Sequence, residues 1–559
     1  MNNGQAITAQ PNRASACKQP KLHFVHIYHV TRTKFGVLAT NHQDAIKAAE
    51  HEFETLPSGQ TWDSDTPGYL GSEDACEVLS FMVDEAGDEE FERSASYEAD
   101  GITPSRTSIA ASPGLQRFVF AAARDGDMLL DTIEAASIDQ ARTDAIALAP
   151  MTDRITYLEE GDWAVITRAG AEIFDAADRR ANRAETRIQI EAARIEKGGY
   201  KHFMAKEIAE QPVVIADALK HYTGGGVTPA LRLPEGVDFT AVDRVVMVAC
   251  GTASYACHVA KYWFEQIAGL PAEVDIASEF RYRDPVLSEK SWAVFVSQSG
   301  ETADTLAALR HCKEKVAKVV SVVNVPTSSI ARESDLSLPI MAGVEVGVAS
   351  TKAFTCQLTV LALLAVKAGL DRGRLTAEQA AAHLGGLRNL PGLMNHALGL
   401  SGAIAGVAEE LAEAQDVLFL GRGAMYPLAL EGALKLKEIS YIHAEGYASG
   451  ELKHGPIALI DARVPVIVLA PRDHLFDKTV SNMQEVMARH GKVLLISDAA
   501  GVAEAGQGVW KTLVLPEVEA AFAPILYAVP AQLLAYHTAI AKGTDVDQPR
   551  NLAKSVTVE

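Results

Sequence analysis

Short apolar runs alternate with Ala- and Leu-rich helical patterns along the chain after about residue 240. Four such runs are RVVMVAC (244–250), WAVFVS (292–297), KVVSVVNV (318–325) and LSLPIMA (336–342). They are rich in β-branched residues and nearly continuous, which is typical of strands buried on both faces of a parallel sheet. The pattern predicts an α/β unit with open crevices at the carboxyl ends of its strands.

A second unit of the same kind begins at DVLFLGRGAMYPLALEGALKLKEIS (416–440). It continues through PVIVLAP (465–471) and KVLLISD (492–498) and ends in the helical pattern YAVPAQLLAYHTAIAKG. In both units a strand ends in a glycine-containing turn, CGT or GRG, and leads into a helix. Two similar halves of about 150 residues predict a duplicated domain with a site where the halves meet.

The front of the chain has a different pattern. Residues 22–50 and 115–145 each read as two strands followed by a short helix, whereas residues 50–100 are acidic and rich in turn residues. This weak repeat predicts one or two strand–strand–helix modules. We favour a compact appendage over a partner-binding module.

Composition narrows the possible functions. The 559 residues carry a formal charge of −21, which gives no overall basic surface for nucleic acid. The six cysteines are scattered without a C-x-x-C pair or metal-ligand spacing, so we expect no metal site and a reducing, cytoplasmic compartment. The N-terminus lacks the apolar core of a signal peptide, and no run of about 18 apolar residues predicts a membrane span.

A hydroxyl-rich turn follows the run WAVFVS. Its side chains, with free backbone N–H groups where the next helix begins, could hold a phosphate monoester; they are Ser297, Gln298, Ser299 and Thr302. No Gly-Lys-Ser/Thr motif is present, so magnesium-nucleotide chemistry is not indicated. The alternative is that Ser299 or Thr302 only caps the helix. Two further hydroxyl-rich turns, ACGTASYA (249–256) and GVASTKAFT (347–355), favour a phosphosugar pocket.

Ionisable candidates lie in the second unit. Lys435 and Glu438 are three residues apart, so they share one face of a helix. An exposed salt bridge is one interpretation; the apolar flanks favour a partly buried pair in which Glu438 acts as a proton-transfer base. His454 lies in a turn between glycine and proline, and the amine of Lys554 could attack a sugar carbonyl once desolvated. Taken singly, each of these residues is more often a surface residue.

Six segments together resemble one family. Residues 195–559 resemble the isomerase half of the glucosamine-6-phosphate synthases, which are also called glutamine:fructose-6-phosphate aminotransferases (isomerizing). The segments that carry the resemblance are CGTASY, ASEFRYR, SQSGETADT, GVASTKAFT, EGALKLKEISYIHAEGYASGELKHGP and KGTDVDQPRNLAKSVTVE. The resemblance implies two flavodoxin-like sugar-isomerase (SIS) domains. It also implies conversion of fructose 6-phosphate and ammonia into glucosamine 6-phosphate, the first step towards UDP-N-acetylglucosamine, by a homodimer without metal or organic cofactor.

The same resemblance implies roles for the candidate residues. Glu438 would move the proton between C1 and C2 of the sugar, with help from Lys435, and Lys554 would form the Schiff base. His454, from a second subunit, would open the sugar ring. The hydroxyl-rich turn at 297–302 would hold the phosphate, and the sugar would lie near a second group of residues, Thr252, Val348, Ala349 and Ser350. Ala253 departs from the family, in which many members have serine there.

The front of the chain departs further. Family members begin Met-Cys-Gly-Ile and use the cysteine to attack glutamine, whereas this sequence begins Met-Asn-Asn and has only the internal Cys17 nearby. Only residues 143–175 resemble the last strands of the glutaminase domain. We therefore expect use of ammonia, and the following domains: an unrelated α+β region (1–140), a glutaminase remnant (141–195), a linker (196–240), SIS domain 1 (241–400) and SIS domain 2 with the catalytic tail (401–559).

Two alternatives remain at this point. The first is a phosphosugar isomerase that interconverts fructose and glucose 6-phosphates through Glu438. The second is a non-catalytic SIS sensor of phosphosugars that acts through residues 1–140. The presence of both a candidate base and a candidate nucleophilic amine counts against a sensor.

Overall fold

The computed structural model describes residues 197–224 and 230–556, together with shorter segments nearer the N-terminus, namely 7–8, 21–29, 32–39, 69–73, 78–85, 95–98, 116–124, 127–135, 154–156, 163–167, 170–175, 177–183 and 185–187. The chain divides into two units, Met1–Arg117 and Phe118–Glu559.

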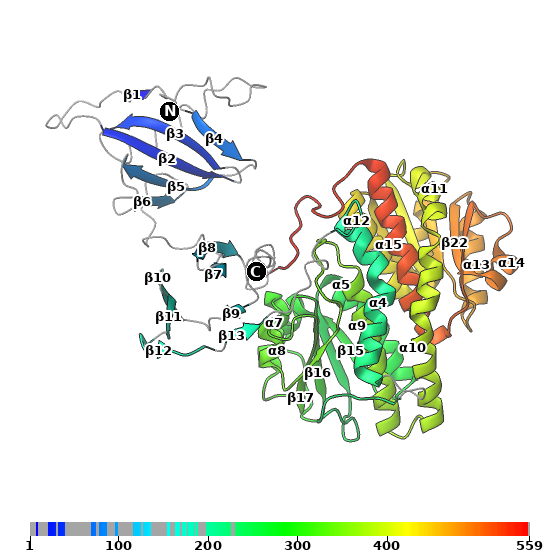
Figure 1. Cartoon of the computed structure of the whole chain (residues 1–559). Coiled ribbons are helices and arrows are strands. Elements are labelled where there is room, and N and C mark those ends of the chain that lie inside the picture. The colour runs from blue at the N-terminus through cyan, green and yellow to red at the C-terminus, as the bar shows by residue number, and fades with distance from the viewer. Residues whose placement is uncertain are drawn as a thin grey trace. The chain divides into compact units, whose positions relative to one another are not determined.

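The first unit contains one sheet with strand order β1-β3-β2-β5-β6, in which β4 also pairs with β3 (Figure 1). Its strands are β1 (Ile7–Thr8), β2 (Lys21–His29), β3 (Arg32–Ala39), β4 (Tyr69–Glu73), β5 (Val78–Glu85) and β6 (Ala95–Glu98). Strands β2 and β3 form an antiparallel hairpin, which confirms the two strands of the first predicted module. The helix predicted after them lies outside the described residues.

The segment between the first unit and residue 190 is also strand-rich. Strands β7 (Gln116–Arg124) and β8 (Asp127–Ala135) pair, which confirms the strands of the second predicted module; its helix too lies outside the described residues. Strands β10 (Trp163–Thr167), β11 (Gly170–Phe174) and β12 (Arg180–Ala181) form an antiparallel sheet, and β9 (Arg154–Thr156) pairs with β13 (Glu185–Arg187).

The first α/β unit contains a five-stranded sheet in which every strand pair is parallel. Its order is β15-β14-β16-β17-β18, formed by β14 (Val245–Ala249), β15 (Ala272–Ile276), β16 (Trp292–Ser297), β17 (Lys318–Val323) and β18 (Leu336–Pro339). This is the flavodoxin-like order 2-1-3-4-5, which opens a crevice between β14 and β16, where the strand order reverses. All four predicted strands are confirmed.

The second α/β unit repeats this topology. Its parallel sheet has the order β20-β19-β21-β22-β23, formed by β19 (Asp416–Gly421), β20 (His443–Ala448), β21 (Pro465–Leu469), β22 (Lys492–Asp498) and β23 (Lys511–Leu515). The equal strand order confirms a duplicated α/β fold. The apolar-run pattern missed β15, β20 and β23 because they lie at sheet edges and are only partly buried.

Helices fill the space around both sheets. They are α4 (Phe203–Thr223), α5 (Gly251–Gln266), α6 (Ala277–Arg283), α7 (Ala303–Cys312), α8 (Ser329–Glu333), α9 (Lys352–Asp371), α10 (Ala377–Leu398), α11 (Ser401–Leu411), α12 (Met425–Ser440), α13 (Phe476–Met487), α14 (Ala499–Ala505) and α15 (Ala523–Lys542), with 3-10 helices η1 (Ser449–His454), η2 (Pro456–Leu459) and η3 (Ala520–Phe522). Figure 1 shows α4, α10 and α15 between the sheet with β16 and the sheet with β22.

One hydrophobic core joins the two sheets. It includes Met247 of β14, Leu361 of α9, Phe419 of β19 and Leu526 of α15, all fully buried. Helix α9 is apolar on nearly all sides, as expected for a helix surrounded by protein. It is the one helix among the described residues that is long and apolar enough to cross a membrane, and 89% of that stretch is buried inside the protein.

Candidate active site

The hydroxyl-rich turn lies between β16 and α7, at the carboxyl edge of the first sheet. Ser297, the last residue of β16, is buried and its Oγ accepts a hydrogen bond from the N–H of Gly300 at 2.9 Å. Its hydroxyl also lies 3.1 Å from the hydroxyl of Thr302. Ser299 Oγ accepts from the N–H of Glu301 at 3.1 Å, and the carbonyl of Gln298 accepts from the N–H of Asn324 at 3.2 Å. The four predicted residues therefore form one compact turn.

This turn is shaped for more than helix capping. Thr302 is the N-cap residue of α7, yet its side chain makes no capping hydrogen bond and instead meets Ser297. Gly300 has a φ of +73°, and a Cβ there would lie 2.0 Å from Ser328 Oγ, so only glycine fits. The N–H groups of the turn are bonded within the protein: those of Gly300 and Glu301 donate to Ser297 and Ser299, and that of Ala303 donates to the carbonyl of Val556.

The C-terminal segment lies against this turn. Ser555 Oγ is hydrogen-bonded to Ser299 Oγ at 3.1 Å, and the N–H of Ala303 donates to the carbonyl of Val556 at 3.1 Å. Lys554 directly precedes these two residues. Lys554 is therefore the neighbour in sequence of two residues that contact the hydroxyl-rich turn, although 252 or more residues separate it from that turn along the chain.

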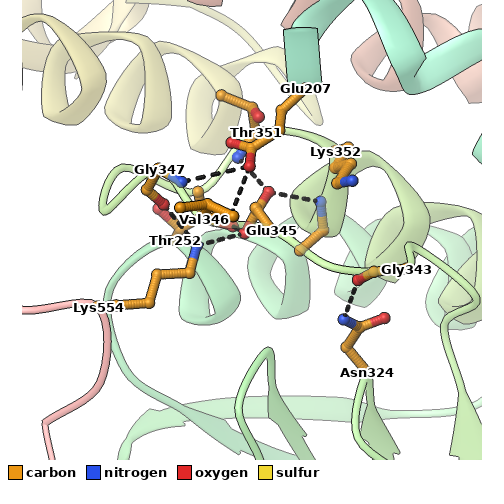
Figure 2. Close-up of polar contacts among 12 residues, drawn as sticks. Glu207, Thr252, Asn324, Gly343, Glu345, Val346, Gly347, Thr351, Lys352 and Lys554 are labelled. Carbon is orange, nitrogen blue, oxygen red and sulfur yellow. Dashed lines mark hydrogen bonds and ion pairs between the residues drawn. The ribbon is translucent and has the colours of Figure 1, made fainter. Parts of the chain in front are cut away.

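The amine of Lys554 is anchored in the loop before α9. Its Nζ donates to Glu345 Oε2 and to the carbonyl of Gly347, each at 2.7 Å, and its side chain is 14% exposed (Figure 2). Glu345 is completely buried. Burial opposes its charge, but the Lys554 ammonium and hydrogen bonds from Lys554, Thr351 and Ala353 lower the pKa of the carboxyl to about 2.

The same loop carries three of the four residues predicted to lie near the sugar. The N–H of Val348 donates to the carbonyl of Asp547 at 2.9 Å, so the loop is tied to the C-terminal segment. Ala349 is buried, and Ser350 Oγ donates to Glu345 Oε2 at 3.1 Å. The structure therefore brings Val348, Ala349 and Ser350 together with Lys554.

Helix α12 supplies a buried group of charges. Lys435, 1% exposed, contacts Glu438 and lies 3.7 Å from Glu431 Oε1. Burial opposes the ammonium, but the charges of Glu431 and Glu438 raise the pKa of Lys435 overall. The Glu438 side chain is 20% exposed, which confirms the partly buried pair predicted from the sequence.

Thr252 links this group to the first α/β unit. It lies in the first turn of α5, and its Oγ1 donates to Glu431 Oε1 at 3.3 Å. Burial, reinforced by the charge of Glu438, raises the pKa of Glu431 to about 8 although Lys435 acts in the opposite direction.

His454 does not join these groups. It is exposed at the end of η1, and among the described residues no hydrogen bond or ion pair connects it to Lys435, Glu438 or Lys554. The role of His454 from a second subunit, which the family resemblance implies, stays a prediction.

Sequence reasoning missed three buried carboxyls: Glu207, Glu345 and Glu431. Glu431 lies four residues before Lys435, so the helical spacing could have indicated it. Glu345 and Glu207 reach Lys554 and its loop only through the fold, and no local pattern signals them.

Comparisons with known proteins agree with this arrangement. The SIS domain family model matches residues 238–367 and 410–542, so the chain contains two SIS domains. Glutamine–fructose-6-phosphate aminotransferase (isomerizing) from Bradyrhizobium diazoefficiens is 58% identical over 420 residues, 75% of this chain and 69% of the relative. The protein of the same name from Zymomonas mobilis is 58% identical over 418 residues, with the same coverage.

A solved structure, the C-terminal domain of glucosamine-fructose-6-phosphate aminotransferase from Francisella tularensis, is 46% identical with a TM-score of 0.61. It covers 63% of this chain and 100% of that domain. The chain therefore belongs to the glutamine–fructose-6-phosphate aminotransferase (isomerizing) family.

A longer alignment with a Bradyrhizobium diazoefficiens protein of the same name has 52% identity over 504 residues, 88% of this chain and 81% of the relative. Residues 141–559 make up only about three quarters of the chain, so this alignment includes part of the segment before residue 141. The domain limits expected from the sequence stay predictions.

Proposed function

We propose that this chain converts fructose 6-phosphate and ammonia into glucosamine 6-phosphate. One observation supports this most directly: the C-terminal segment contacts the hydroxyl-rich turn through Ser555 and Val556, the two residues that follow Lys554. An anion-binding turn next to a primary amine suits a phosphorylated sugar whose carbonyl reacts with that amine. The family of the chain supports the same substrate class.

In this proposal the turn binds the substrate phosphate through Ser297, Gln298, Ser299 and Thr302. Lys554 attacks the carbonyl carbon, C2, and the carbonyl oxygen leaves as water to give an imine, from which ammonia then displaces the lysine amine. Val348, Ala349 and Ser350 line the sugar beside Lys554, and Thr252 contributes from the side of α12 through its contact with Glu431. Binding of the phosphate at one end fixes the distance of C2 from the amine.

The proton transfer is assigned to α12. Glu438 is the partly exposed carboxylate of the α12 group, so substrate can reach it, and it would move a proton between C1 and C2. Lys435, held by two carboxyls, would assist by stabilising negative charge that develops on the sugar oxygen. His454 would act from the second subunit of a homodimer on the closed sugar ring.

The nitrogen donor in this proposal is free ammonia. The Met-Cys-Gly-Ile motif that the family resemblance implies for glutamine hydrolysis does not occur in this sequence, and Cys17 is flanked by Ala16 and Lys18. We also propose a reducing, cytoplasmic setting, which the four free cysteines of the described part support; these are Cys250, Cys257, Cys312 and Cys356.

The test is product formation with two nitrogen sources. Purified protein is incubated with fructose 6-phosphate and either ammonium chloride or glutamine, and glucosamine 6-phosphate is measured by mass spectrometry. We expect product with ammonium and none with glutamine, and loss of product in Glu438→Gln. Product with glutamine would refute the choice of ammonia. Glucose 6-phosphate alone would indicate an isomerase, and binding without turnover would indicate a sensor.

A further inference from the structure

The glycine-containing turn GRG in the second half has no part in the proposed chemistry so far. It consists of Gly421, the last residue of β19, with Arg422 and Gly423. In the first half the corresponding turn, CGT after β14, places Thr252 against Glu431. Strands β14 and β19 hold the same position in their sheets, so the GRG turn lies at the equivalent edge of the second sheet.

Arg422 of this turn lies against the 3-10 helix η1. A Cβ at Gly450 would lie 3.2 Å from Nη2 of Arg422 and 3.4 Å from its Cζ, so glycine lets the backbone of η1 pack closely on the guanidinium. Nη1 of Arg422 donates to Oδ1 of Asn482, a buried residue of α13, at 2.9 Å. Arg422 therefore connects the end of β19 with both η1 and α13.

Three further contacts hold η1 in place. Ser449, its first residue, is completely buried and donates through its Oγ to the carbonyl of Gly421 at 3.0 Å. Leu452 is fully buried in the hydrophobic cluster that β19, β21 and α13 share. Lys453 pairs with Glu485 of α13 at 2.7 Å. The short helix is thus attached to a central strand and to a neighbouring helix along its length.

His454 is the last residue of η1 and is exposed. Gly455 follows it with a φ of +145°, a conformation that residues with a side chain rarely adopt, and η1 ends there. The imidazole therefore stands at the end of a helix whose other contacts are all with its own subunit. A shift of η1 would move His454 with it.

We propose that Arg422 is a positioning residue for His454: together with Ser449 it holds η1 so that the imidazole meets the sugar ring bound to a second subunit. The proposal rests on the proposed function, because it takes His454 as the group that opens the ring. It gives the GRG turn a role in the site of the other subunit, whereas the CGT turn belongs to the site of its own subunit.

The step that depends on this position is ring opening. The C2–O5 bond of the furanose breaks, its electron pair goes to O5, and O5 takes a proton from protonated His454. The C2 hydroxyl becomes the carbonyl and releases its proton to water, and water returns a proton to His454. The imidazole must lie within hydrogen-bond distance of O5, so a displaced η1 slows ring opening but not the later steps at C1 and C2.

The experiment compares a closed sugar with an open one. 5-Deoxyfructose 6-phosphate lacks the hydroxyl group that closes the ring, so it reaches the site as the open ketone. Full-length protein is given equal concentrations of this sugar and fructose 6-phosphate with ammonium chloride, and both amino-sugar products are measured by mass spectrometry. The product ratio equals the ratio of the two kcat/KM values, and it does not depend on how much of the protein is active.

The variants are Arg422→Met, His454→Ala and the control Arg472→Met. Arg472 follows β21 at the same edge of the sheet, but its guanidinium pairs with Glu504 at 2.9 Å. We expect Arg422→Met to lower the ratio of closed-sugar to open-sugar product about 5- to 20-fold, because misplacing a reacting group by about 1 Å can cost about 100-fold. His454→Ala should lower it further, and Arg472→Met should keep the wild-type ratio.

Each other outcome has a definite meaning. A wild-type ratio in Arg422→Met, or an equal fall in Arg472→Met, would mean that Arg422 has only a general structural role and would overturn the inference. A wild-type ratio in His454→Ala would overturn the role of His454 and the inference with it. Absence of both products in the wild type would instead overturn the proposed function.

A second variant covers a folding failure of Arg422→Met, which thermal unfolding would detect. Ser449→Ala removes the hydrogen bond to the Gly421 carbonyl and leaves Arg422 in place. We expect the product ratio to fall about 3- to 10-fold, because η1 loses its direct attachment to β19. A folded Ser449→Ala protein with the wild-type ratio would also overturn the inference.

Discussion

Replacement of Gly300 by alanine tests the geometry of the hydroxyl-rich turn. A Cβ at this position would lie 2.0 Å from Oγ and 2.5 Å from Cβ of Ser328. Ser328 cannot move without losing hydrogen bonds, because its hydroxyl donates to the carbonyl of Val325 at 2.7 Å and accepts from the N–H of Ala331 at the start of α8. The new methyl group must therefore displace either the cap of α8 or the turn itself.

The expected decrease in the free energy of unfolding has two parts. A non-glycine residue in the left-handed region costs about 1–2 kcal/mol, and loss of a serine N-cap costs about 1 kcal/mol. We therefore expect Gly300→Ala to lower the free energy of unfolding by about 2–3 kcal/mol. Gly373→Ala is the matched control. Gly373 also has a positive φ, +66°, but no atom lies within 4 Å of the point that its new methyl group would occupy. This variant should therefore lose only the stability that the left-handed backbone conformation costs.

The assay combines urea unfolding of both variants with the KM for fructose 6-phosphate. Gly300→Ala should also raise KM at least about tenfold, because a turn displaced by about 1 Å loses more than about 1.4 kcal/mol of phosphate binding. Gly373→Ala should leave KM unchanged. Equal stabilities of the two variants, or an unchanged KM in Gly300→Ala, would refute the assignment of this turn as the phosphate site.

Three further predictions concern the buried polar groups. The pKa of Glu431 is raised from near 4.5 to about 8, so its neutral form stabilises the fold fully below pH 4.5 and this contribution is lost as pH rises to about 8. The free energy of unfolding of the wild type should therefore fall between pH 6 and 9, and urea unfolding should show that Glu431→Gln removes about 2–3 kcal/mol of this fall. Lys435→Met should lower the free energy of unfolding by about 3–5 kcal/mol because it leaves buried carboxyls without their cation, whereas Lys437→Met, exposed on the same helix, should stay within about 0.5 kcal/mol. Ser297→Ala removes the acceptor for the Gly300 N–H and should cost about 1–3 kcal/mol and raise KM for fructose 6-phosphate, and an unchanged KM would count against its role.

The sequence predicted the parts of the fold that depend on continuous burial. Strand β16 has the predicted bounds, Trp292–Ser297, because each of its residues is buried and the pattern is uninterrupted. Strand β20 was not predicted, because it lies at the sheet edge and is only partly buried. The turn after β16 was also predictable, since its hydroxyls are neighbours in sequence and the strand end places them together.

The missing part of the site depends on long-range contacts. Glu207, Glu345 and Lys554 come from a helix before the first sheet, a loop after it and the end of the chain, so no spacing relates them. A buried glutamate on an amphipathic helix such as α4 is read from sequence as a surface residue, because carboxyls are seldom fully buried unless they are paired. The hydrogen-bond partners of Glu207 are two backbone N–H groups of a distant loop, and backbone groups cannot be recognised from residue types in the sequence.

The duplicated fold explains why the site needs both halves. Helix α15 of the second half lies in the shared core and ends at Lys542. The chain then returns to the first half. There Asp547 accepts hydrogen bonds at the start of α4, and Lys554 contacts Glu345. Thr252 of the first half meets Glu431 of the second on the other side. The first half therefore contains the hydroxyl-rich turn but neither the amine of Lys554 nor the carboxyl of Glu438. The second half contains these two groups but not the turn. Either half alone lacks one part of this arrangement, so the two copies of one fold are no longer interchangeable, and their packing through the common core positions the hydroxyl-rich turn relative to Lys554.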